Sequence, residues 1–399
     1  MSTLSLLVAY VAAVTLLVSA MVALLFYLCW RLHLAFWSPR LGNSPAYAEL
    51  EEHTLPDGGV IALRRIRGGA SPEATAASAR VPVLLIHGLA MNHRCFDLDE
   101  TSLARHLARE GFDVWLLTLR SGRSYLSPFG PRHCDFASMV AHDLPFAVDA
   151  VRARTGKPQV DVAGLSMGGM LLYAGLGRSL AQDKVRRVIV FGSPGKIRAL
   201  GPISLSRFLP ARLALGVPMR AWLRTVAFAP RLVPRLLWRR LYNPANLEAP
   251  FERRMLWNVW ENIPGRLGHD FVSWSAAGGA ITVDHTPVLA GLAHVDVPAL
   301  FFAGSVDWLA PVTCVRAAYD AWGSALPMVD KQFVVMGRET SGASCDYGHC
   351  DLILGHNAAR EVFEPAVAFL RADERYHGVQ HSTPAPKLDA PVAPLARQA

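Results

Sequence analysis

Hydrophobic positions along the chain form two patterns, and the first is an uninterrupted run near its start. Residues 4–30 contain no charged side chain. As a helix they would be roughly 40 Å long, more than the ~30 Å hydrocarbon core of a bilayer. The run has no basic residue before it and no clear A-x-A site, which favours a retained membrane anchor over a signal peptide. Arg31 and Arg40 follow it, so the positive-inside rule predicts a single-pass membrane protein whose C-terminal part faces the cytoplasm.

The second pattern is a regular alternation of short apolar runs with helical stretches. A hairpin is predicted around Asp57 and Gly58, with its second strand at 60–66. Apolar runs predict further strands at 81–86, 112–119, 160–163, 188–192, 297–304 and 331–336. Helices are predicted between or after them, at 101–110, 136–155, 169–177, 312–322 and 358–371. Such alternation predicts an α/β fold, a mostly parallel sheet with helices on both faces.

The alternation stops between Lys196 and Val297, which predicts an insertion. The chain then divides into five parts. A transmembrane anchor with its flank (1–40) precedes the first part of an α/β core (41–195). A helical lid or cap insertion (196–297), the second part of the core (298–375) and a tail (376–399) follow. The tail is rich in Pro and Ala without apolar periodicity, and is predicted to be disordered. Residues 68–80, rich in Ala, Ser and Gly, are predicted to be a flexible connection.

The segment QVDVAGLSMGGM, residues 159–170, places a serine on a sharp turn. It contains the G-x-S-x-G motif from Gly164 to Gly168, with a predicted strand before it and a helix after it. Glycines two residues either side of Ser166 fit a turn too crowded for a Cβ atom. The turn would hold the hydroxyl clear of the backbone and aim the following N–H groups at one point, where an oxyanion can be held. The pentapeptide alone is weak evidence, so the other parts of a site must be found.

Two later turns supply candidates for the base and the acid that a serine nucleophile needs. GSVDWLAP, residues 304–311, places Asp307 after an apolar strand, and DYGHCD, residues 346–351, places His349 after the next strand. Both turns lie where the C-terminal ends of parallel strands converge. The order Ser166, Asp307, His349 is the one that a nucleophile elbow of this kind uses.

Each of these candidates has an alternative. Asp307 could merely cap the helix that follows it. His349 could be a surface-loop histidine, with His356 as its rival. Asp346 and Asp351 are rivals for the acid, although both lie close in sequence to His349.

The strand at 81–86 ends in His87 and Gly88. Gly88 lets the backbone bend close to the serine, so that the N–H groups of Leu89 and Met167 can face the same oxyanion. His87 itself is expected to be structural rather than catalytic.

Composition excludes several other functions. The net charge is +8, but no zinc-finger or aromatic RNP pattern occurs, so no nucleic-acid partner is expected. No G-x-x-x-x-G-K-[ST] loop and no metal-ligand spacing of His and Cys occur, so neither a cofactor nor a metal is predicted. The six cysteines include no C-x-x-C pair, which is typical of free thiols in a reducing compartment.

Much of the positive charge lies in the predicted insertion. From Arg198 to Leu247 there are nine arginines and no acidic residue, interleaved with leucines and aromatic residues. This pattern is typical of a basic amphipathic surface that lies on an anionic bilayer. The alternative is a solvated lid whose arginines pair with carboxylates elsewhere in the protein.

Residues 82–355 resemble the α/β hydrolases, and most of all their acid lipase branch. The resemblance is carried by LLIHGLAMNHRCF (84–96), GFDVWLLTLRSGRS (111–124), DLPFAVDAVRARTG (143–156), VAGLSMGGM (162–170), GSVDWLAP (304–311) and YGHCDLILG (347–355). It implies a triad of Ser166, Asp307 and His349, with Leu89 and Met167 as oxyanion donors. Polyhydroxyalkanoate synthases share much of the pattern, but they have a cysteine at the position of Ser166. The R-G-N segment of the acid lipases reads Arg-Ser-Gly at 120–122 here.

Together these observations predict a membrane-anchored serine hydrolase that cleaves carboxylic esters of lipid-like or apolar substrates through an acyl-enzyme. An acyltransferase of the same fold would use an alcohol in place of water, and the sequence does not separate the two. Serine at the elbow argues against dehalogenases and epoxide hydrolases, which have Asp there. The alternative from another class is a catalytically inactive hydrolase fold that binds an apolar ligand or a protein partner.

Overall fold

The computed structural model describes residues 3–67, 81–123, 134–199 and 216–372. The predicted flexible connection at 68–80 and the predicted disordered tail at 376–399 lie outside the described residues. So does part of the predicted insertion, at 200–215.

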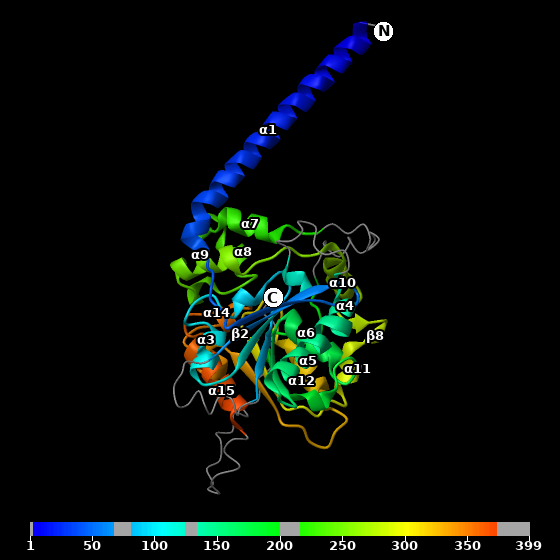
Figure 1. Cartoon of the computed structure of the whole chain (residues 1–399), viewed down its shortest axis with the longest axis vertical. Coiled ribbons are helices and arrows are strands. Elements are labelled where there is room, and N and C mark those ends of the chain that lie inside the picture. Colours follow the sequence, from blue (N-terminus) through cyan, green and yellow to red (C-terminus); the bar gives the residue numbers. More distant parts are fainter. Residues whose placement is uncertain (1–2, 68–80, 124–133, 200–215, 373–399) are drawn as a thin grey trace, which may run out of the picture.

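Helix α1 (Thr3–Leu41) projects away from the rest of the molecule (Figure 1). Its side chains are exposed from Ser5 to Cys29. Within the described residues it is the one helix long and apolar enough to cross a membrane, and a signal sequence near an N-terminus would meet the same criteria.

The last turns of α1 are fixed to the body of the protein. The ring of Trp37 stacks on Phe228 with centroids 5.8 Å apart, and the ring of His33 meets the edge of Phe228 at 5.7 Å. Asn258 Nδ2 donates a hydrogen bond of 2.7 Å to the carbonyl oxygen of Leu41, which is buried. Apolar and polar contacts therefore both hold the base of α1 in place.

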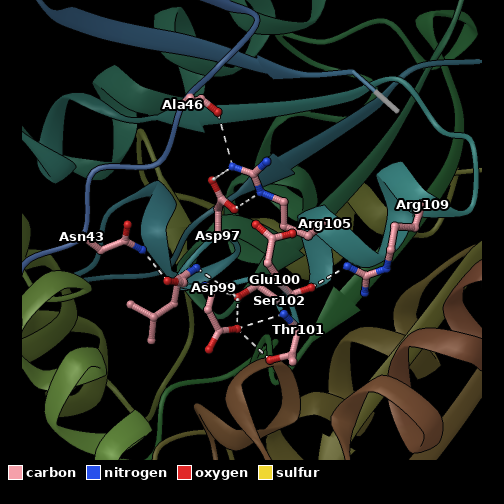
Figure 2. A network of polar contacts seen from close by, with 10 residues as sticks. Asn43, Ala46, Asp97, Asp99, Glu100, Thr101, Ser102, Arg105 and Arg109 are labelled. Carbon is pink, nitrogen blue, oxygen red and sulfur yellow. Dashed lines mark hydrogen bonds and ion pairs between the residues drawn. The ribbon is translucent and has the colours of Figure 1, made fainter. Parts of the chain in front are cut away.

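The chain just beyond α1 is fastened to the core by the network in Figure 2. Asp97 is buried and accepts hydrogen bonds of 2.7 and 3.2 Å from the guanidinium of Arg105. Arg105 also donates to the carbonyl of Ala46, and the amide of Asn43 donates to the carbonyl of Leu98. The connection between α1 and the first strand is therefore ordered by side chains of the core.

An eight-stranded sheet forms the centre of the body, in the order β1-β2-β4-β3-β5-β6-β9-β10. Its strands are β1 (Glu49–Thr54), β2 (Val60–Ile66), β3 (Val83–Ile86), β4 (Val114–Thr118), β5 (Val160–Leu165), β6 (Val185–Phe191), β9 (Ala299–Gly304) and β10 (Lys331–Met336). The six neighbouring strands β4, β3, β5, β6, β9 and β10 run parallel. β1 and β2 form an antiparallel hairpin, and β2 pairs antiparallel with β4. The predicted parallel sheet is confirmed, and the predicted hairpin forms one edge of it.

Helices cover both faces of this sheet, each over its own hydrophobic core (Figure 1). One core includes residues of α3 (Leu103–Arg109), α14 (Asp351–Leu354) and α15 (Glu364–Leu370). The other includes residues of α5 (Leu144–Thr155), α6 (Met167–Gly175), α11 (Val288–Leu292) and α12 (Val312–Ala321). Successive side chains of a strand point to opposite faces, and β3 contributes Val83 and Leu85 to one core and Leu84 and Ile86 to the other.

Some predicted helices are less regular than the sequence indicates. The predicted helix at 136–155 consists of α4 (Phe136–Ser138), a π turn (Met139–Asp143) and α5. The last helix begins with a second π turn (Ala359–Phe363). The remaining short helix of the core is α13 (Arg338–Ser341).

Between β6 and β9 the described residues add no strand to the main sheet. They form α7 (Met219–Val226), α8 (Arg235–Trp238), α9 (Ala249–Asn258), α10 (Gly265–Ala276) and α11, together with the two-stranded ribbon of β7 (Thr282–Val283) and β8 (Thr286–Pro287). We call residues 216–264, which include α7 to α9, the cap. Figure 1 shows that the cap lies at the end of the body from which α1 emerges.

Arg120 ties the edge hairpin to the core. Its side chain is fully buried and forms ion pairs of 2.6 Å with the buried carboxylate of Asp143 and 2.5 Å with Asp57 of the hairpin turn. Burial raises the pKa of Asp143 to about 6 although Arg120 opposes the shift. The segment that departs from the acid lipase R-G-N pattern is therefore held by a buried ion pair.

We predict that Arg120→Met destabilises the protein by about 3–5 kcal/mol, because it leaves the carboxylate of Asp143 buried without its partner. Arg152→Met is the matched control, since Arg152 and Asp149 form a 2.8 Å pair with both side chains partly exposed, worth under about 1 kcal/mol. Unfolding of the full chain in detergent measures both. Equal losses of stability would contradict this account of Arg120.

Candidate active site

The turn between β5 and α6 places Ser166 under backbone strain. Ser166 has φ 52° and ψ −117°, a conformation that L-residues rarely adopt. A Cβ atom on Gly164 would collide with the backbone of Gly169, and one on Gly168 would collide with the carbonyl of Ile86. The two glycines of the motif are therefore required by close packing of backbone against backbone. Strained residues of this kind occur mainly at functional sites.

A buried histidine and a buried aspartate are paired at the neighbouring strand ends. His349 Nδ1 donates a hydrogen bond of 2.7 Å to Asp307 Oδ2, and both side chains are almost fully buried. The other oxygen of Asp307 accepts a 2.8 Å bond from the N–H of Ala310. The aspartate therefore both orders its own turn and holds the imidazole with its proton on Nδ1, which leaves Nε2 available to accept one.

The residues Phe191 and Gly192, at the end of β6, bring this pair beside the elbow. Ser166 donates its backbone N–H to the carbonyl of Phe191 at 2.9 Å. A Cβ atom on Gly192 would lie 3.2 Å from both Asp307 Oδ2 and His349 Nδ1. The structure thus places Ser166 and the Asp307–His349 pair against neighbouring residues at the end of β6, on the side where the parallel strands β5, β6, β9 and β10 have their C-terminal ends and where sheets of this class place their sites.

The rival residues lie in other environments. The side chain of His356 is 58% exposed and lies 3.0 Å from Glu248. Asp346 accepts hydrogen bonds from the Ser305 hydroxyl and from the backbone of Arg338. None of these contacts involves His349, so neither rival is in a position to replace the Asp307–His349 pair.

His87 holds the loop that faces the elbow. Its Nδ1 donates to the carbonyl of Gly88 at 2.9 Å, and its Nε2 accepts a 3.1 Å bond from the N–H of Leu119. Burial lowers the pKa of His87 to about 4, so the ring is neutral at pH 7. These contacts agree with the structural role expected of His87.

The predicted oxyanion donors lie on the two segments that meet at Ser166. A Cβ atom on Gly88 would stand 3.1 Å from the Cβ of Ser166, so the backbone that leads into Leu89 passes directly beside the serine. Met167 begins α6, and the first N–H groups of a helix have no partner within that helix. The two segments that carry the predicted donors therefore meet beside Ser166.

Asp351 has a role that the sequence does not reveal. It is buried and accepts hydrogen bonds from the N–H of Gly348 (3.0 Å), the N–H of Asn243 (3.1 Å) and the side chain of Asn246 (3.0 Å). Because Gly348 precedes His349 while Asn243 and Asn246 belong to the cap, this carboxylate links the cap to the histidine loop. The only signal in the sequence is its position two residues after His349, which indicates an alternative to Asp307 as the acid and no link to the cap.

Two of the nine arginines from Arg198 to Leu247 also reach this region. The guanidinium of Arg198 stacks on the ring of Trp308 at 4.2 Å and donates a 2.7 Å bond to its carbonyl. Arg240 lies over the same ring at 5.1 Å. These arginines therefore contact the residue after Asp307. Among the described residues, no cluster of His, Cys, Asp and Glu could hold a metal ion.

We predict a pH-dependent difference in stability between the wild type and Asp351→Asn, in which the amide imitates the protonated acid. Burial raises the pKa of Asp351 to about 6, so the folded state binds the proton more tightly than the unfolded state does. Stability from this group is present below about pH 4 and lost as the pH rises through 6. The free energy of unfolding is measured for both proteins at pH 4 and pH 8. From pH 4 to pH 8 the value for the variant minus that for the wild type should rise by about 2–3 kcal/mol. A shift in the opposite direction would contradict this role of burial.

Comparison with known proteins adds to this geometry. The model of the alpha/beta hydrolase family matches residues 83–395. Triacylglycerol lipase 2 of Arabidopsis thaliana is 28% identical over 185 residues, which cover 42% of this chain and 44% of that protein. Gastric triacylglycerol lipase of Bos taurus is 31% identical over 130 residues, covering 30% and 32% respectively. The chain thus matches less than half the length of these curated relatives.

Solved structures share the fold. An esterase from Exiguobacterium antarcticum aligns with a TM-score of 0.51 at 14% identity, covering 80% of this chain and 98% of that one. A thermophilic esterase from Thermogutta terrifontis aligns with a TM-score of 0.50 at 18% identity, covering 82% and 99%. At these identities the likeness concerns the fold alone. From the family match over residues 83–395, the chain belongs to the alpha/beta hydrolase family.

Proposed function

We propose that the protein is a membrane-anchored serine hydrolase that cleaves carboxylic esters of lipid-like substrates. The observation that carries this proposal is the buried 2.7 Å pair of His349 and Asp307 beside the strained Ser166. Activation of a serine hydroxyl needs a base that a carboxylate holds in one tautomer. The similarity to proteins named triacylglycerol lipases supports an apolar acyl ester as the substrate.

In the proposed mechanism Ser166 attacks the acyl carbonyl while Nε2 of His349 takes the hydroxyl proton. The negative charge that develops on the carbonyl oxygen is stabilised by the N–H groups of Leu89 and Met167. His349 then gives its proton to the departing alcohol, leaving an acyl group on Ser166. Water attacks this acyl-enzyme with His349 again as the base, and the carboxylic acid is released. Throughout, Asp307 remains ionised and stabilises the imidazolium.

Helix α1 is proposed to be a retained anchor. The contacts at its base support this, because Trp37 and Leu41 pack against the hydrophobic core of the body. Removing α1 as a signal peptide would separate some or all of these contacts from the fold. Arg31 and Arg40 lie at its body-side end, and by the positive-inside rule they favour a catalytic domain on the cytoplasmic side.

The cap is proposed to act as a lid that faces the membrane. Leucines and a tryptophan are exposed on it, at Trp222 (44%), Leu232 (79%), Leu236 (69%) and Leu237 (40%). The alternative in which the lid arginines pair with carboxylates applies to Arg220, which lies 3.0 Å from Glu261. Arg231, Arg235 and Arg239 are exposed and form no ion pair within the described residues. Exposed cations beside exposed apolar groups are typical of surfaces that lie on anionic bilayers.

We predict that Ser166→Ala and His349→Ala lower kcat for p-nitrophenyl esters by a factor on the order of 10⁶, and Asp307→Asn by about 10⁴. The asparagine variant is milder because the histidine remains in place. Ser324→Ala, at an exposed serine, is the matched control and should be fully active.

The same assays test the assignment of the acid. Full activity of Asp307→Asn together with inactive Asp346→Asn or Asp351→Asn would show that Asp307 is misassigned. Wild-type turnover by Ser166→Ala would remove the nucleophile from the proposal altogether.

A further inference from the structure

A pocket of about 570 Å³ lies where α1 meets the cap. Its wall is formed by the end of α1, by the turn Pro230–Leu232 and by the start of α9. A smaller pocket of about 210 Å³ adjoins it, because Pro230, Arg231 and Ala249 line both. Neither pocket includes Ser166, Asp307 or His349, so the catalytic chemistry does not account for them.

The charge on the wall of the larger pocket is entirely positive. Within the described residues it is lined by Arg40, Arg231, Arg253 and Arg254 and by no carboxylate. Only Arg254 is neutralised, by a 3.0 Å ion pair with Asp99. The guanidinium of Arg40 lies over the ring of Phe36 at 3.8 Å, and Arg231 and Arg253 form no ion pair with any described residue. Arginines without acidic partners on the wall of one pocket favour a phosphate, which arginine can bind through two parallel hydrogen bonds.

The position of the pocket favours a lipid phosphate over a free anion. Arg31 is the first charged residue of α1. His33 Nε2, two residues further on, lies 3.0 Å from the carbonyl of Arg224 in α7. The cap therefore reaches α1 close to the point where the helix would leave the hydrocarbon. The turn Pro230–Leu232 begins four residues after α7 ends, and its Leu232, which lines the pocket, is 79% exposed. A wall that combines arginines with an exposed leucine suits an amphiphile.

The base of α1 holds this arrangement in place. The Trp37–Phe228 stack and the hydrogen bond from Asn258 to Leu41 join α1 to the segments on either side of the pocket. If α1 spans a bilayer, its direction fixes which side of the pocket faces the headgroups. Basic pockets beside membrane-spanning helices on the cytoplasmic side are known to bind anionic headgroups.

We infer that this pocket binds the phosphate-bearing headgroup of an anionic phospholipid in the leaflet next to the catalytic domain. The inference rests on the membrane-anchored arrangement proposed above. It adds a lipid site separate from the ester-cleaving site, whose occupant would hold the cap against the bilayer.

The test compares lipids with the same acyl chains and different headgroups around the full-length protein. The chain is reconstituted into phosphatidylcholine nanodiscs in which brominated phosphatidylglycerol or brominated phosphatidylcholine replaces part of the lipid. Brominated chains quench nearby tryptophans, and Trp37 and Trp238 lie at the two pockets or beside them. We expect phosphatidylglycerol to be preferred about three- to tenfold over phosphatidylcholine, because both headgroups carry a phosphate but only choline adds a cation that the arginines repel.

Matched double variants separate the pocket from general surface charge. Arg231→Gln with Arg253→Gln should reduce the preference to about twofold or less. Arg178→Gln with Arg266→Gln removes the same charge from exposed arginines that lie outside the cap and line neither pocket, and should leave it unchanged. Equal losses in the two double variants would overturn the inference in favour of diffuse attraction. Abolition of the preference by millimolar inorganic phosphate at constant ionic strength would overturn the lipid source in favour of a free-anion site.

Two further readouts keep this inference distinct from the proposed function. Hydrolysis of a soluble short ester is measured in the same nanodiscs, and both double variants should retain it. In the wild-type protein, equal quenching by the two brominated lipids with ester hydrolysis intact would defeat the pocket alone. A lipid preference without any ester hydrolysis would defeat the proposed enzyme and leave the pocket. Release of the full chain from vesicles by alkaline carbonate would defeat the anchor and the pocket together.

Discussion

The contact between the elbow and the strands on either side of it is the constraint on which the site depends. Backbone approaches backbone so closely at Gly164 and Gly168 that neither position has room for a Cβ atom, and Ser166 is held at positive φ between them. That conformation costs free energy of order 1–3 kcal/mol. Packing of the buried sheet around β5 offsets this cost. Because Ser166 is also bonded to Phe191, the serine keeps a fixed relation to the end of β6. The Asp307–His349 pair lies directly against the next residue, Gly192.

A second set of contacts joins the site to the proposed membrane surface. Asp351 accepts hydrogen bonds from the histidine loop at Gly348 and from the cap at Asn243 and Asn246. The cap in turn holds the base of α1 through Phe228 and Asn258. Contacts therefore run without a break from α1 through the cap to the loop that carries His349. Because Arg240 of the cap also lies over the ring of Trp308, a change in how the cap meets a bilayer would reach both the loop of His349 and the turn after Asp307.

Local patterns in the sequence were sufficient for much of this structure. Strands such as β3 and β9 are continuous apolar runs, and the parallel sheet with helices on both faces is confirmed. The triad remains a prediction. Its three residues come from turns at strand ends, and Ser166 and the Asp307–His349 pair lie against Phe191 and Gly192 at the end of β6. Contacts between distant segments could not be derived. Nothing local indicates that Trp37 stacks on Phe228, or that Arg198 and Arg240 share the ring of Trp308. Arg120 is similar, because its two carboxylates lie 63 and 23 residues away.

The central claim is that Ser166 is a nucleophile activated by the His349–Asp307 pair. The most direct test is to label the purified, folded full-length protein with a fluorophosphonate probe, which reacts with activated serines, and to identify the modified peptide by mass spectrometry. The account predicts rapid labelling confined to Ser166, lost in Ser166→Ala and strongly slowed in His349→Ala, with both variants folded. A wild-type protein that is folded and remains unlabelled, or one labelled at another serine, would contradict it.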